Sequence, residues 1–204
     1  MGKIAQFWLL LFLAWPIALV QAEGYGYGTG AEDPLIKAFQ NVVKDGKTGN
    51  WPKVSQHVKG IEVPLKNLKE YFKIDLQTKL EAGIRSQDIQ VVVKSMAHLI
   101  FLAIKEKFYW NLKENLSDPA ASLSRLKLAK RYYTDILMGN VKNLDGRHQS
   151  NLNESILAEF ENSFKALGNP GVFGMGAIPP KPDEFKESTL RIEGKILKAF
   201  PYFD

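Results

Sequence analysis

One arginine lies where a helix of this chain should face the core. A helical wheel over the segment 119–138 places Arg125 near the centre of a broad arc of leucine, alanine, isoleucine and tyrosine side chains. An arginine in such a place needs a carboxylate or a ligand, because an unpaired buried charge is strongly unfavourable. Its chemistry is therefore the recognition of an anion, either a carboxylate of the protein itself or a bound ligand.

Partners for Arg125 can be named from the helical segment that precedes it. Glu106 and Glu114 are the natural candidates for an internal ion pair, which is the interpretation we favour. The alternative is an anionic or polar ligand that Arg125 holds together with Tyr132 or Tyr109. Arg125, Tyr132, Tyr109 and Glu106 are thus the candidate ligand-binding residues of this face.

The opposite face of the same helix is basic. Lys127, Lys130 and Arg131 lie on it, and the segment 119–147 holds six basic and two acidic residues. Its net charge of +4 equals that of the chain without residues 1–22, since the total is +5 and Lys3 is the one charge removed. Such a face could contact an anionic small molecule, an acidic protein, an anionic membrane surface or a cell-wall polyanion. We expect no nucleic-acid partner, because no strand with interleaved aromatic and basic residues is present.

Histidine and carboxylate residues give only a weak indication of a metal site. Asp145 and His148 fall together in a predicted loop, where a structural turn is the more common arrangement. The wheel of the preceding long helix places His98 between Lys94 and Lys105, on a narrow polar stripe that should be partly exposed. Two neighbouring ammonium groups oppose a metal cation there. The weak candidates for metal ligands are His98, Glu106, Asp145 and His148.

Missing motifs exclude several classes of protein. The chain has no cysteine, and therefore no disulfide, thiolate metal site or covalent haem. It also has no phosphate-binding glycine loop, no nucleophile elbow, no H-E-x-x-H and no Glu-x-x-His turn. A metal or a non-covalent haem remains possible, although neither is favoured. No arrangement of residues demands catalysis, so the sequence leans against an enzyme.

Helix signals recur along the chain, whereas strand signals barely appear. Asp33-Pro34 and Asp118-Pro119 each place a capping residue before proline at the first helical position, and Asp75 and Asp88 are further caps. The longest predicted helix runs from Ser86 or Asp88 to about Asn115 and is almost wholly apolar over 91–104, so other helices must cover it. A short connection then predicts an antiparallel hairpin with the next helix. These signals predict an all-α, single-domain bundle of about five to seven helices with a long central helix.

The sequence after Asp118 predicts further helix ends, caps and contacts. The helix after Asp118 should end at about Gly139, and Asn151 with Glu154 should form a capping box for the next one. Residues 168–182 should be irregular, and Asp183 should cap the last helix. The aromatic C-terminus should fold back onto the bundle, against Phe173 and Met175.

The N-terminal residues have the pattern of an export signal. Residues 1–22 combine one basic residue, an apolar run and a small-residue cleavage site, which predicts a signal peptide. Residues 23–32 read as a Gly/Tyr-rich flexible leader, and 33–204 as the helical bundle domain, with no transmembrane span in the mature chain. We therefore expect a periplasmic or secreted binding or accessory protein that engages an anionic ligand or partner through its basic hairpin. The alternative is a metal- or haem-handling bundle.

Overall fold

The computed structural model describes residues 33–171 and 175–203, and the expected signal peptide and leader lie outside them. The helices are α1 (Pro34–Lys47), α2 (Trp51–Lys59), α3 (Glu62–Phe72), α4 (Leu76–Arg85), α5 (Ile89–Lys113), α6 (Pro119–Tyr132), α7 (Met138–His148), α8 (Leu152–Ala166) and α9 (Pro182–Ala199). A π-helical turn (Tyr133–Leu137) joins α6 to α7, and a 3-10 turn (Pro201–Phe203) follows α9. The predicted all-α class is confirmed. None of these described helices has the length and apolar content needed to cross a membrane.

The aspartates chosen as caps from the sequence do begin helices. Asp33, Asp75, Asp88 and Asp118 each accept hydrogen bonds from backbone amides in the first turn of α1, α4, α5 and α6. A capping carboxylate satisfies amides that have no partner within the helix and interacts favourably with the helix dipole. The described residues form nine α-helices, more than the five to seven expected, because the chain breaks at Gly60 and continues past Gly139.

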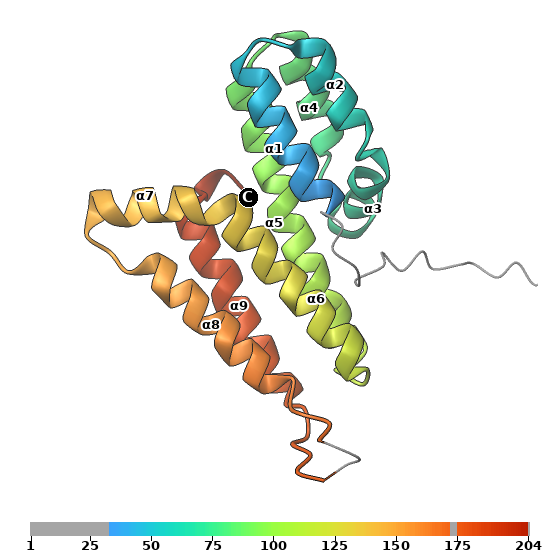
Figure 1. Cartoon of the computed structure of the whole chain (residues 1–204), viewed down its shortest axis with the longest axis vertical. Coiled ribbons are helices and arrows are strands. Elements are labelled where there is room, and N and C mark those ends of the chain that lie inside the picture. The colour runs from blue at the N-terminus through green and yellow to red at the C-terminus, as the bar shows by residue number, and fades with distance from the viewer. Residues whose placement is uncertain (1–32, 172–174, 204) are drawn as a thin grey trace, which may run out of the picture. The chain divides into compact units, whose positions relative to one another are not determined.

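Helix α5 forms the centre of the fold, as its composition predicts. All ten residues from Ser95 to Ile104 are buried, because α1, α3, α4, α6 and α9 all pack against α5 (Figure 1). The predicted hairpin of α5 and α6 is also present. Its turn places Asn115 at φ 52° and Leu116 at φ 56°, and Leu116 is buried against the core.

Helix α7 contradicts the loop that the sequence predicts after Gly139. Gly139 continues the helix, since one glycine inside a helix costs only about 1 kcal/mol and packing outweighs it. Asp145 therefore lies on a helix and not in a loop. Its carboxylate caps α8 instead, because it accepts the amides of Leu152 at 2.9 Å and Asn153 at 2.8 Å. The expected capping box of Asn151 is wrong, since the Asn151 side chain makes no capping bond.

The cap at Asp145 makes stability depend on pH. Hydrogen bonds from Ser150 and from the amides of Asn153 and Leu152 hold the Asp145 pKa below its ordinary value of 3.8. A lowered pKa in the folded protein contributes stability above pH 3.8, and this is lost as the pH falls through the folded value. We expect Asp145→Asn to flatten the dependence of unfolding temperature on pH below 4, measured by circular dichroism. A slope equal to that of the wild type would contradict this role.

The C-terminal segment folds back onto the bundle as expected, but against different residues. Phe200 and Phe203 are buried and stack on each other with ring centroids 4.8 Å apart. Phe203 also stacks on His98, at 4.9 Å, and on Phe101 of α5. The expected partner Met175 is 74% exposed, and Phe173 lies outside the described residues. His98 is only 4% exposed, so its predicted position at the surface is wrong; the C-terminal ring covers it.

Candidate functional site

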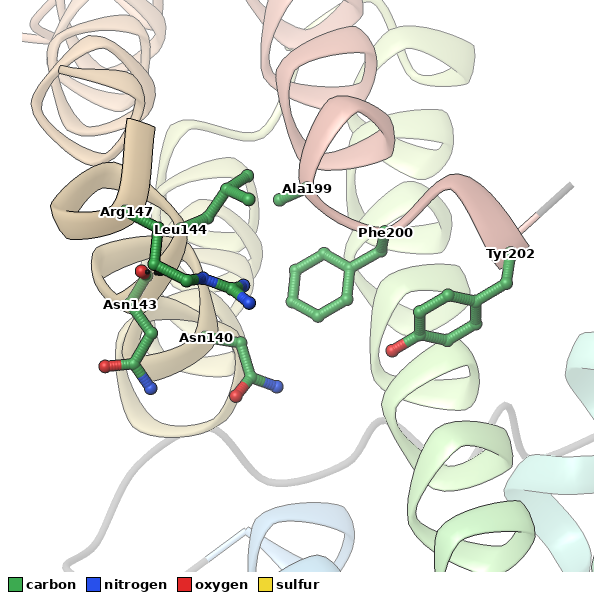
Figure 2. Close-up of a pocket in the computed structure, with 7 residues that line it drawn as sticks. All are labelled: Asn140, Asn143, Leu144, Arg147, Ala199, Phe200 and Tyr202. Carbon is green, nitrogen blue, oxygen red and sulfur yellow. Dashed lines mark hydrogen bonds between the residues drawn. The ribbon is translucent and has the colours of Figure 1, made fainter. Parts of the chain in front are cut away.

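A pocket of about 540 Å³ lies between α7 and the C-terminal segment. It is lined by Asn140, Asn143, Leu144, Arg147, Ala199, Phe200 and Tyr202 (Figure 2). Two amides, a guanidinium and a phenol hydroxyl therefore surround a space large enough for a small molecule. Within the described residues, this arrangement offers more converging hydrogen-bond donors around one cavity than the predicted site at Arg125 does.

One face of α7 supplies the polar wall of this pocket. Asn140, Asn143, Leu144 and Arg147 follow a spacing of three, four and seven residues, which places them on one side of a helix. The helix is anchored by Val141, which is fully buried, and by its packing against α8 and α9. Figure 2 shows the Arg147 guanidinium directed from α7 toward Phe200.

The opposite wall is the end of α9 and the turn after it. Stacking of Phe200 on Phe203 fixes this turn, and Tyr202 between them points its hydroxyl toward α7 (Figure 2). Burial raises the pKa of Tyr202, so its hydroxyl stays protonated and can donate a hydrogen bond at neutral pH. The Lys94 ammonium lies 5.6 Å from the centre of the Tyr202 ring and adds positive charge at this wall.

Arg147 gives the pocket its positive charge. Its Nε donates to the Asn143 carbonyl oxygen at 3.3 Å, which holds the side chain along the helix. No carboxylate of the described residues lies within ion-pair distance of its guanidinium. Guanidinium groups bind carboxylate and phosphate with two parallel hydrogen bonds. As far as the described residues go, the pocket can therefore accept an anion without first breaking an ion pair of Arg147.

Arg125 occupies the internal ion pair that the sequence favours. Its guanidinium donates to both carboxylate oxygens of Glu114, at 2.6 and 3.0 Å, and to the side-chain oxygen of Asn111 at 3.3 Å. Asn111 is itself buried and donates to the Ser122 carbonyl oxygen, so α5 and α6 are tied together at this level. Of the two expected carboxylates, Glu114 is the partner.

The other residues expected around Arg125 make separate contacts. Tyr132 is buried and its hydroxyl donates to the Asp33 carboxylate at 3.1 Å. Glu106 accepts from Lys107 at 2.8 Å, and Tyr109 is 45% exposed, beside Trp110. These three side chains therefore contact different neighbours, namely Asp33, Lys107 and Trp110.

The basic residues on the outer face of α6 are partly neutralised. Lys130 contacts Glu161 of α8 at 2.7 Å, and Arg131 lies 3.6 Å from Asp135 on its own helix. Lys127 is exposed and has no carboxylate within ion-pair distance among the described residues. Of the basic residues in the segment 119–147, Arg147 is the one that lines the pocket.

The metal candidates do not come together. His98 is stacked on Phe203, Asp145 caps α8, Glu106 pairs with Lys107, and His148 is exposed at the end of α7. Among residues 33–171 and 175–203, no three carboxylate or imidazole groups gather in a way that could hold a metal ion.

Sequence reasoning missed the pocket because it assigned residues 140–150 to a loop. The spacing of Asn140, Asn143 and Arg147 was visible, but it indicates a common face only once the segment is known to be a helix. Comparisons of this chain with protein-family models, with curated proteins and with solved structures give no match.

Proposed function

We propose that this protein is a binding or accessory protein that holds a small anionic molecule in the pocket between α7 and the C-terminal segment. The observation that carries the proposal is the Arg147 guanidinium, which faces a cavity and has no carboxylate partner among the described residues. Asn140, Asn143 and Tyr202 add uncharged donors, which suits a ligand with a carboxylate or phosphate group and further polar atoms.

The charge of the chain supports the same proposal. Its total is +5, and the segment 119–147, which has a net charge of +4, ends at Arg147. A positive surface raises the local concentration of anions and speeds their association. The basic hairpin expected from the sequence would attract the ligand, and the pocket would bind it.

We further propose that residues 1–22 direct export and are removed after Ala22, so that the protein acts in the periplasm or outside the cell. The support is the order of a basic residue, an apolar run and a cleavage site in the sequence. The mass of the protein isolated from its own cells tests this directly. A polypeptide that begins at Glu23 is expected, and an intact Met1 terminus would overturn the proposal.

Binding at the pocket is tested with glucuronate and inorganic phosphate as probes. We expect either probe to shift the side-chain amide NMR signals of Asn140 and Asn143. Replacing Arg147 by Gln should weaken this binding by roughly 10- to 100-fold, since a charge-assisted hydrogen bond contributes about 1.5–3 kcal/mol.

The matched control is Arg131→Gln, which removes the same charge from the same basic segment. Arg131 is half-exposed and pairs with Asp135, away from the residues that line the pocket. Equal loss of binding in both variants would show that the probes respond to overall charge, and would contradict the pocket as their site.

A further inference from the structure

A cluster of aromatic side chains lies at the surface where α3 meets α5. Tyr71, from the last turn of α3, contacts Tyr109 and Trp110 of α5, with ring centroids 6.2 and 5.7 Å apart. Tyr109 and Trp110 contact each other at 5.5 Å. Tyr71 is 47% exposed and Tyr109 45%, so two of the rings are open to solvent. We call these three residues the aromatic patch.

The patch is rigid because of how its residues are placed. Trp110 meets Tyr71 and Tyr109 edge to face, at interplanar angles of 86° and 74°. This is a favoured and stabilising geometry for aromatic pairs. Tyr109 and Trp110 both belong to α5, the longest helix, which is packed against several other helices. A ligand that binds here would not have to order the rings first.

A cation completes the patch. Lys113, one turn further along α5, places its ammonium 4.5 Å from the centre of the Trp110 ring and 5.7 Å from that of Tyr109. In the described part of the chain, no carboxylate lies within ion-pair distance of Lys113. Glu114, the residue next to Lys113, is paired with Arg125 of α6. The patch therefore combines partly exposed aromatic rings with the positive charge of Lys113.

We propose that the aromatic patch binds an acidic carbohydrate chain. Sugar rings present a face of C–H groups that packs on an aromatic face, and tyrosine hydroxyls and the indole N–H can bond to sugar hydroxyls at the rim. The Lys113 ammonium meets the carboxylate of a uronic acid unit, which gives the charge complementarity that an uncharged sugar lacks. A membrane surface fits less well, since binding there scales with the apolar area buried and is typical of a whole apolar helix face, whereas the patch holds three rings, two of which carry hydroxyls.

Alginate, a polymer of uronic acids, is the probe that tests this site, with uncharged dextran as its comparison. In native gels that contain either polymer, we expect alginate to retard the protein and dextran to leave its migration unchanged. Tyr109→Ser and Lys113→Gln should each weaken the retardation by about three- to tenfold. Both side chains are exposed or half-exposed at the surface, and an unchanged unfolding temperature will show that the variants fold.

Lys53→Gln on α2 is the matched control, because it removes one exposed charge from another helix. Its retardation should equal that of the wild type, and an equal loss in both lysine variants would overturn the proposal. So would binding to vesicles of anionic lipid that depends on Tyr109 while alginate binding does not. The pocket shares no residue with the aromatic patch. In an Arg147→Gln background, the Tyr109 and Lys113 substitutions should therefore weaken the alginate retardation by the same factor as in the wild type. The two proposals can therefore fail separately.

Discussion

Replacement of Phe160 by alanine is expected to lower the free energy of unfolding by about 3–5 kcal/mol. Phe160 of α8 is fully buried, and its ring lies 5.9 Å from that of Tyr133 and 6.1 Å from that of Phe108. These two neighbours belong to the π-helical turn and to α5, so one side chain fills space between three segments. Alanine would leave a cavity there, because helices packed on several sides cannot move together to close it.

Urea denaturation followed by circular dichroism measures this effect. Phe164→Ala is the control, because Phe164 lies one turn further along α8, is only partly buried and has the Lys130 ammonium 5.6 Å from its ring centre. Phe164→Ala should lower the free energy of unfolding clearly less than Phe160→Ala does. If the two variants unfolded at the same urea concentration, the contact of α8 with α5 and the π-helical turn would not be a principal source of stability.

Replacement of Gly168 by alanine is expected to destabilise the protein by at least about 2 kcal/mol, for two reasons that add. Gly168 has φ +72°, which alanine adopts at a cost of about 1–2 kcal/mol. A methyl group there would also collide with the carbonyl oxygen of Ile178 and lie 2.8 Å from the carbonyl carbon of Pro179. These atoms cannot give way easily, because Asn169 and Ile178 exchange two backbone hydrogen bonds across the connection.

The variant Gly176→Ala distinguishes the cost of the positive φ angle from the cost of the steric collision. Gly176 lies in the same connection at φ +70°, but no atom is within 4 Å of the position its methyl group would take. Gly176→Ala should therefore show only the backbone cost, about 1–2 kcal/mol. Equal unfolding free energies for the two variants would mean that the connection opens to accept the methyl group at 168, and that the bridge between Asn169 and Ile178 is weak.

The elements that the sequence predicts well are those with strong local signals. Aspartate caps, proline at the first helical position and the long apolar run of α5 all act within a few residues, and each is found where expected. The described parts of the connection, 168–171 and 175–181, are irregular as expected, but Lys181 and not Asp183 is the residue before the last helix. Local chemistry determines these helix ends, apart from shifts of one or two residues.

The site depended on contacts between distant residues, which local patterns do not reveal. Asp145 looked like a loop residue because its partners, the amides of Leu152 and Asn153, belong to the next helix. His98 looked exposed because Phe203, which covers it, lies more than one hundred residues away in the sequence. The ion pair of Arg125 and Glu114 could be anticipated, since the hairpin brings its two helices together and a buried arginine needs a carboxylate.

The π-helical turn determines which face of α7 meets the C-terminal segment. The Met138 amide bonds to the carbonyl of Tyr133, five residues earlier, so this turn holds one residue more than an α-helical turn. Deleting one residue here would let α6 continue as a regular helix and would rotate all of α7 by about 100°. Asn140, Asn143 and Arg147 would then leave the pocket together. In evolutionary terms, the loss of a single codon would be enough to turn the polar face of α7 away from this pocket.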